Sequence, residues 1–193
     1  MRVLVLYAHP VEASFGAALN AAVQQGLGEG GHEVDACDLY AEGFDPLLSR
    51  EDRLAYHDTT RNRAAVETHV ARLEAAEGLV TVSPIWNFGV PAILKGYMDR
   101  VFLPGVTFRM EGGRVRSSDL RLRATASVHT YGAKRWQAWG VGDPPRRQLR
   151  RVIGGLVAPA GRHRYLALYD MNNATDARRS AFLAQVRRTL ARF

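Results

Sequence analysis

Three short segments of the chain carry residue types that could bind a flat ligand and its phosphate groups. Residues 9–16 hold a histidine and a serine at the expected start of a helix, where free backbone N–H groups favour anions. Residues 84–90 include Trp86 and Phe88, and such rings can wall a flat heterocycle. Residues 129–133 add further polar and aromatic groups.

Each of these segments also has a purely structural interpretation, and the residues leave both open. Ser14 is a common type of helix N-cap, and Phe15 could be a core residue. The rings of Trp86 and Phe88 could cap the core or fill a subunit interface. No G-x-x-x-x-G-K-S/T loop occurs, and no G-x-G-x-x-G turn follows the first expected strand. Those absences disfavour a P-loop nucleotidase and a dinucleotide-binding Rossmann site.

Apolar, β-branched segments alternate with amphipathic ones along the chain, which predicts βαβ units and a mostly parallel sheet. The strands read as nearly continuous apolar runs, as expected when helices cover both faces of the sheet. Ser14 and Thr175 are expected to cap the first and last helices. The expected strands are 2–8, 33–38, 78–83, 124–130 and 164–170, and the expected helices are 14–28, 64–76, 91–102, 144–157 and 176–191.

Five such units in 193 residues predict an α/β flavodoxin-like three-layer sandwich with a five-stranded parallel sheet in the order 2-1-3-4-5. No repeat or linker divides the chain, so residues 1–193 are expected to form a single domain. In an open α/β sheet the ligand binds beyond the carboxyl ends of the strands, at the switch point. That rule selects the loops after the first, third and fourth strands, which are the three segments with unusual residues.

Composition and charge narrow the possible partners. The net charge of +7 admits nucleic-acid binding, but the arginines are scattered and no RNA-recognition or zinc-ligand spacing accompanies them. Neither nucleic acid nor a metal ion is therefore expected as a ligand. Cys37 is the single cysteine, which excludes an internal disulfide and favours a reducing, cytoplasmic location. No run of about 18 apolar residues occurs, so membrane insertion is not expected.

Four blocks of the sequence resemble one known family. The segment PIWNFGVPAILKGYMDRVF, residues 84–102, resembles the PxxWFGxPAxLKGWxxRVF signature of NAD(P)H:quinone oxidoreductases of the DT-diaphorase type. VLYAHPVEASF resembles the AHxxxxSF start of that family, where phosphate binds. DLYAEGFDPLLSREDRLAY and RLEAAEGLVTVSP resemble its DLYAxxFxPxxSRxD and KLEAADLVIFQxP blocks. The resemblance covers nearly all of residues 2–110 and is weaker after that.

The resemblance implies a flavin-dependent enzyme, because members of that family bind FAD or FMN and pass a hydride from NAD(P)H to a quinone or similar acceptor. It also implies ping-pong kinetics and a homodimer with the flavin at the interface, reached by residues 40–58 of the partner. His129 or Tyr131 could supply a proton or hydrogen bond to the acceptor. The flavin-binding positions carried over are His9, Ser14, Phe15 and Gly16 at the phosphates, Pro84, Ile85, Trp86, Asn87 and Phe88 at the ring and ribityl chain, and Thr130 and Gly132 at the pyrimidine edge.

Departures from the family pattern leave alternatives open. Asn87-Phe88 stands where the family has Trp-Phe, and Val141 occupies the position of its relay histidine. FMN and FAD are both candidates, because residues 50–64 form a shorter segment than in FAD-binding mammalian members. The alternative function is a flavin-binding regulatory subunit of a potassium-efflux system, or another partner-docking module. Gly89 is expected to provide a sharp turn at positive φ between loop and helix.

Overall fold

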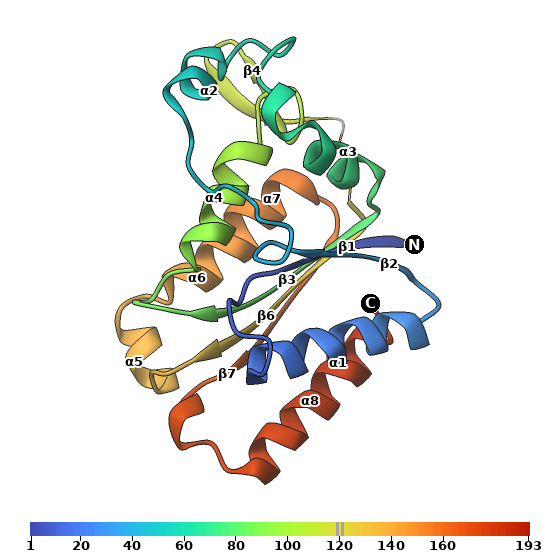
Figure 1. The fold of residues 1–193 in the computed structure, drawn as a ribbon, viewed down its shortest axis with the longest axis vertical. Coiled ribbons are helices and arrows are strands. Elements are labelled where there is room, and N and C mark those ends of the chain that lie inside the picture. Colours follow the sequence, from blue (N-terminus) through green and yellow to red (C-terminus); the bar gives the residue numbers. More distant parts are fainter. Residues whose placement is uncertain (119, 121) are drawn as a thin grey trace.

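The central sheet of the protein contains five parallel strands in the order β2-β1-β3-β6-β7. In the computed structural model, which describes residues 1–118, 120 and 122–193, these strands are β1 (Arg2–Tyr7), β2 (Glu33–Asp38), β3 (Gly78–Ile85), β6 (Ala124–Tyr131) and β7 (Arg162–Leu168). Counted within this sheet alone, the order is 2-1-3-4-5 (Figure 1). The predicted α/β flavodoxin-like sandwich is therefore confirmed.

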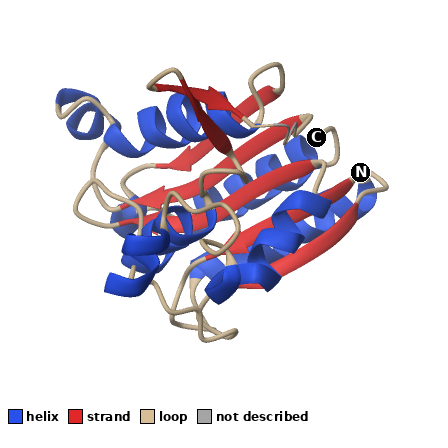
Figure 2. Cartoon of the chain, turned by 90° about the horizontal axis from the view of Figure 1, so that it is seen from above, coloured by secondary structure: helices blue, strands red, loops and turns tan. Residues whose placement is uncertain are grey.

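Helices cover both faces of this sheet, whose strands run side by side when seen from above (Figure 2). One face carries α1 (Phe15–Glu29) and α8 (Asp176–Leu190), and the other carries α3 (Glu67–Ala75), α4 (Ala92–Val101) and α7 (Gly154–Val157) (Figure 1). Within the described residues, none of the helices combines the length and the apolar character needed to span a bilayer.

Strand β1 shows why the sheet has an apolar core on each face. Successive side chains of a strand point to opposite faces. Leu4 and Leu6 enter the core on the side of α3 and α4, while Val3 and Val5 enter the core on the side of α1 and α8. All four are fully buried, and each such aliphatic side chain contributes about 1.5–3 kcal/mol when it leaves water. Burial on both faces explains why this strand is apolar at consecutive positions.

The carboxyl ends of β1, β3 and β6 lie at one edge of the sheet. Tyr7 pairs with Val82, and Pro84 pairs with Thr130. In Figure 1 the arrowheads of β3 and β6 point to this edge, next to α5 (Arg135–Gly140) and α6 (Pro144–Arg147). The loops after the three strands are thereby brought together.

The two predicted N-caps are present in the structure, whereas the expected helix 144–157 is not continuous. The side chains of Ser14 and Thr175 accept hydrogen bonds from the first turns of α1 and α8, as predicted. The expected helix 144–157 is divided into α6, a π-helical turn η2 (Gln148–Ile153) and α7. Gly154 and Gly155 follow that turn, and glycine is a poor helix former.

Several short elements were not predicted. They are α2 (Arg50–Ala55), α5, the 3-10 turn η3 (Met171–Asn173), and an antiparallel hairpin of β4 (Phe108–Glu111) and β5 (Arg114–Ser117). The expected helix 64–76 is present as the 3-10 turn η1 (Ala64–Val66) followed by α3. The hairpin turns at Gly112 and Gly113, whose φ values are 56° and 75°. A Gly-Gly pair between two short extended segments is a recognised hairpin signal, so this element was readable in the sequence.

Candidate functional site

The loops after β1, β3 and β6 enclose a cavity of about 690 Å³ at the carboxyl edge of the sheet. Small-molecule and cofactor sites typically have volumes of about 300–1,000 Å³. The structure therefore brings together the three segments that the sequence selected. Eleven of the expected site residues line this cavity: His9, Phe15, Gly16, Pro84, Ile85, Trp86, Asn87, Phe88, Thr130, Tyr131 and Gly132.

The start of α1 supplies hydrogen-bond donors to the cavity. His9 Nδ1 accepts a hydrogen bond from the Val11 N–H at 3.0 Å, so the proton of the neutral ring is on Nε2. Ser14 is not a lining residue, and its Oγ accepts a hydrogen bond from the Ala17 N–H at 3.2 Å. That geometry fits the structural interpretation of Ser14 as an N-cap. A Cβ on Gly16 would lie 3.1 Å from the His9 ring, so glycine here allows the imidazole to pack against the helix.

A tight turn between Trp86 and Gly89 forms another part of the wall, where the Trp86 ring lies 6.1 Å from the His9 ring between centres. The Trp86 N–H donates to the Gly89 carbonyl at 3.0 Å, and the Gly89 N–H donates to the Trp86 carbonyl at 2.8 Å. Between them Asn87 and Phe88 have φ values of 50° and 56°. Reciprocal pairing around two residues at positive φ is characteristic of a type I′ turn.

This turn corrects the expectation for Gly89. The residues at positive φ are Asn87 and Phe88, whereas Gly89 is not among the glycines with left-handed φ. A Cβ on Gly89 would meet only the Trp86 carbonyl oxygen, at an ordinary distance of 3.6 Å. The expectation was wrong because the paired residues of the turn are Trp86 and Gly89, which leaves Gly89 just outside the strained centre.

The strain at Phe88 has a consequence for the cavity. An aromatic residue at positive φ costs about 1–3 kcal/mol and persists only where the surroundings impose it. Within the described part of the chain, the Asn87 and Phe88 N–H groups make no hydrogen bond to the protein. The neighbouring Trp86 side chain is half exposed. The turn thus offers a ligand two aromatic rings and two free donors.

His129 lies in the interior of the protein and does not line the cavity. Its side chain is fully buried, and Nδ1 lies 3.0 Å from the Ser83 carbonyl oxygen on the neighbouring strand. Burial lowers the pKa of His129 to about 4, so the ring is neutral near neutral pH. The expected contact between His129 and an acceptor is not supported by this placement, because the ring is enclosed and carries no extra proton.

Tyr131 lines the cavity, but its hydroxyl is engaged elsewhere. The hydroxyl donates to Asp143 Oδ1 at 2.7 Å and also contacts the Tyr165 hydroxyl. Tyr169 donates to the other oxygen of Asp143 at 3.1 Å. Burial, followed by the influence of Tyr165 and Asp143, raises the pKa of Tyr131 and keeps the phenol protonated. Tyr131 therefore acts on the cavity through its ring and its position.

Two lining residues outside the three selected segments were missed by the sequence analysis: Met171 and Asn172. Ala133, which also lines the cavity, lies in the selected segment 129–133 but was not named as a site residue. Met171 and Asn172 belong to the turn η3 that follows β7. The Asn172 side-chain nitrogen lies 3.4 Å from the position that a Cβ on Gly132 would take. The signal was partial, because the carboxyl end of the fifth parallel strand lies at the same edge, whereas the switch-point rule selects only the loops after the first, third and fourth strands.

A second cavity of about 570 Å³ continues along the same edge. Its wall includes Lys134, which follows Ala133, and Asp170, which precedes Met171. It is also lined by Arg135, Arg146 and Arg178, and the Arg146 guanidinium lies 5.4 Å from the centre of the Tyr165 ring. Basic groups gathered in a concave surface attract anions. Part of the positive charge of the chain is thus concentrated beside the first cavity.

This chain is similar to a known protein family and to curated proteins. A family model described as "flavodoxin-like fold" matches residues 1–189. Among curated proteins, NAD(P)H dehydrogenase (quinone) 1 of Cavia porcellus is 32% identical over 150 residues, which cover 69% of this chain and 54% of that protein. The chain spans about half the length of the curated relatives that it matches first.

Two solved structures share the whole fold. Smu.1420 from Streptococcus mutans UA159 has a TM-score of 0.87 and 26% identity, over 100% of both chains. An NAD(P)H:quinone oxidoreductase from Methanothermobacter marburgensis has a TM-score of 0.81 and 26% identity, over 99% of this chain and 96% of that one. Since the family model matches nearly the entire chain, this protein belongs to the family with the flavodoxin-like fold.

Proposed function

We propose that this protein is a flavin-dependent NAD(P)H oxidoreductase that reduces a quinone or a similar electron acceptor. The observation that carries the proposal is the 690 Å³ cavity between the start of α1 and the turn at Trp86. It combines donors suited to phosphate with aromatic walls suited to a flat ring. The names of the guinea-pig and Methanothermobacter relatives support the same activity.

A bound FMN or FAD would supply the redox chemistry, taking a hydride from NAD(P)H and returning two electrons to the acceptor. The residues of this chain would bind and orient that group. The N–H end of α1 and the Nε2–H of His9 suit its phosphates. The free N–H groups of Asn87 and Phe88 suit the polar edge of a ring system, and fixed donors stabilise developing negative charge.

We further propose that one cavity serves both the reductant and the acceptor, which makes the kinetics ping-pong. The neighbouring cavity with Lys134, Arg135, Arg146 and Arg178 suits the phosphate groups of NAD(P)H. Arginine and lysine in a concave surface raise the local concentration of such anions. The high net charge of the chain is consistent with this use of basic residues.

A homodimer with the cavity at its interface is part of the proposal. On α5, beside the cavity, Trp136 is 69% exposed and Trp139 is 81% exposed. Leu47 and Leu54, in the region 40–58 that we expect to reach the partner, are also exposed. Aromatic residues such as these tryptophans are enriched where protein surfaces associate.

Spectroscopy of the purified protein tests the proposal directly. We expect the absorbance of an oxidised flavin at one equivalent per chain, bleaching by NAD(P)H, and recovery on addition of a quinone. Initial rates at several quinone concentrations should give parallel double-reciprocal lines, and light scattering should give the mass of a dimer. Failure to bind FMN and FAD would refute the proposal. Stoichiometric flavin without turnover would favour the regulatory alternative.

Two glycine-to-alanine changes, Gly16 in the cavity wall and Gly89 next to it, test how much backbone space each position needs. Gly16→Ala should weaken flavin binding about three- to tenfold, because the new methyl group would lie 3.1 Å from the His9 ring and must displace it. Gly89→Ala should change affinity less than about twofold, since its Cβ meets only one atom at 3.6 Å. Fluorescence titration of the flavin-free proteins measures both values. Equal losses in the two variants would contradict this account of the wall.

A further inference from the structure

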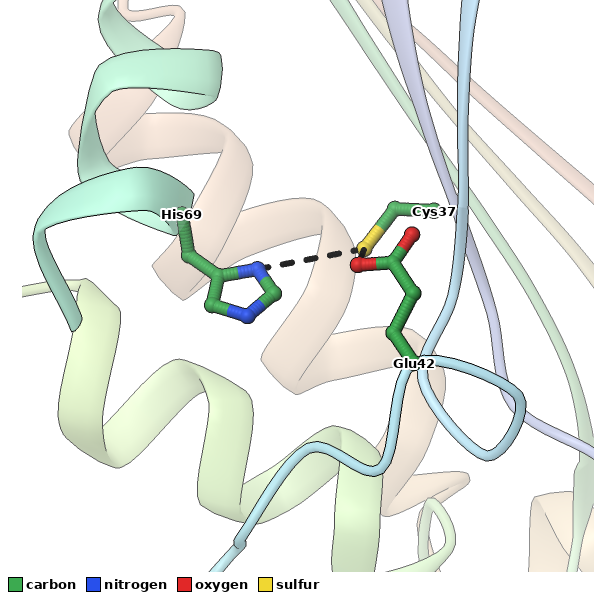
Figure 3. A group of neighbouring side chains, drawn as sticks. All are labelled: Cys37, Glu42 and His69. Carbon is green, nitrogen blue, oxygen red and sulfur yellow. Dashed lines mark hydrogen bonds between the residues drawn. The ribbon is translucent and has the colours of Figure 1, made fainter.

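Three metal-ligating side chains meet away from the cavity described above. Cys37 lies in β2, Glu42 in the loop that follows it and His69 in α3 (Figure 3). Cys37 Sγ is 3.5 Å from Glu42 Oε2 and 4.0 Å from His69 Nδ1. One ligand atom from each residue lies within 4.8 Å of the other two. None of the three residues lines the candidate flavin cavity.

We propose that Cys37, Glu42 and His69 bind a divalent transition metal ion of the zinc class. Thiolate, carboxylate and imidazole are the ligand types that zinc takes in proteins. Bond lengths of about 2.0–2.3 Å place the sulfur about 3.5 Å from the nitrogen and oxygen ligands of a tetrahedral ion. The sulfur–oxygen distance already has that value, and the sulfur–nitrogen distance must shorten by a few tenths of an ångström. The fourth position is left for water.

The Tyr97 hydroxyl is a second and independent indication. The side chain is fully buried, and the hydroxyl has no hydrogen-bond partner among the described residues. Its ring packs edge-on against His69, with 5.6 Å between the ring centres. The Tyr97 ring also packs against the Phe44 ring, with 5.2 Å between centres, and Phe44 in turn packs on His69. A buried, unpaired hydroxyl is costly, and a water molecule on the metal would provide its partner.

The surrounding residues hold the ligands in place. The Phe44 ring packs edge-on against His69 with 4.9 Å between centres, on α3's inner side. Arg72 Nη1 donates to both oxygens of Glu42, at 2.8 and 3.0 Å. Its Nη2 donates to Asp35 Oδ1 at 2.7 Å, so Asp35 balances the arginine charge. Glu42 and the Cys37 thiolate remain as the negative groups facing the cation, with Arg72 orienting the carboxylate from outside.

Binding exchanges a proton for the metal ion. Without metal the Cys37 thiol donates a hydrogen bond to Glu42 Oε2 at 3.5 Å, so the sulfur carries a proton. Binding breaks the S–H bond, forms a sulfur–metal bond and releases one proton to solvent, with no change in oxidation state. Because Cys37 is the single cysteine, a thiolate–metal signal can come from no other residue.

Titration of chelator-treated, tag-free protein with Co²⁺ provides the test, because tetrahedral cobalt is spectroscopically visible in zinc sites. We expect saturation at one Co²⁺ per chain, with a thiolate-to-cobalt charge-transfer band and the visible bands of a four-coordinate ion. About one proton should be released per metal ion in weakly buffered solution. Zn²⁺ should remove the bands by displacement.

Variants assign the ligands. Cys37→Ser should abolish the charge-transfer band, while Glu42→Gln and His69→Gln should each weaken Zn²⁺ binding at least about tenfold. His57→Gln, at an exposed histidine outside the cluster, is the matched control and should remain within about twofold. Circular dichroism and flavin content confirm folding and separate this result from the proposed function. A folded wild-type protein that binds no Co²⁺, or binds it without the thiolate band, would overturn the proposal.

Discussion

A Gly132→Trp variant is expected to lose flavin affinity by at least about a hundredfold, which corresponds to about 2.7 kcal/mol. Gly132 lines the candidate cavity directly after β6 and is exposed. The nearest atom to an added Cβ is the Asn172 side-chain nitrogen at 3.4 Å, so the backbone can accept a side chain. An indole in this position would occupy the volume that the flavin needs. The loss should therefore appear in binding, while the fold is retained.

The control places the same side chain on another exposed glycine. Gly28 lies in α1, outside the cavity wall, and nothing lies within 4 Å of its added Cβ. Gly28→Trp should bind flavin as the wild type does, apart from a small change in stability. Flavin titration and thermal unfolding of both variants make the comparison. If Gly132→Trp were folded and bound flavin normally, the cavity between the three loops would not be the flavin site.

Acidification is expected to destabilise the folded protein through His129 by about 3 kcal/mol. The pKa of this ring falls from 6.5 to about 4 on burial. Between those two values the unfolded chain binds a proton that the folded chain does not. The free energy of unfolding contributed by His129 is therefore complete above pH 6.5, declines as the pH falls, and is lost near pH 4.

Urea unfolding at about pH 7 and about pH 5, an interval over which about 2 kcal/mol of the effect is lost, tests it in the wild type and in His129→Gln. The glutamine amide can donate to the Ser83 carbonyl in place of the imidazole but does not titrate. Burial also lowers the pKa values of His32 and His69, which add their own pH dependence. The quantity to compare is therefore the change in unfolding free energy between the two pH values, in the wild type and in the variant. The variant should show a shallower decline. Equal declines in both proteins would mean that His129 is not buried as a neutral ring.

The sheet and the place of the site were determined by the sequence alone. The run of Val3 to Leu6 is apolar at every position, which occurs when both faces of a strand are covered. Ser14 and Thr175 marked helix starts by hydrogen-bonding chemistry that acts over three residues. From these local signals the order of the strands and the edge that carries the loops followed by general rules of α/β topology.

The conformation of the loop after β3 depends on which of its residues form paired hydrogen bonds, and the residue types alone do not specify that. Asn87, Phe88 and Gly89 are consecutive, and glycine is by itself the best candidate for positive φ. The hydrogen bonds between Trp86 and Gly89 instead place Asn87 and Phe88 at the centre of the turn. The folded structure decides which residues adopt positive φ, because the stabilisation from the paired hydrogen bonds and from the aromatic contacts must exceed the strain at Phe88.

The tertiary structure also decided how deeply His129 is buried and which residues far apart in the sequence come into contact. His129 and Tyr131 lie on the same face of β6, as the strand period requires, but His129 is two residues, or about 6–7 Å, further from the edge and is enclosed there. Cys37 and His69 are 32 residues apart, and their spacing matches no zinc-ligand motif. They meet because α3 packs on the face of the sheet into which Cys37 points. Side-chain periodicity states which face a residue occupies, whereas its neighbours on that face depend on how the layers pack.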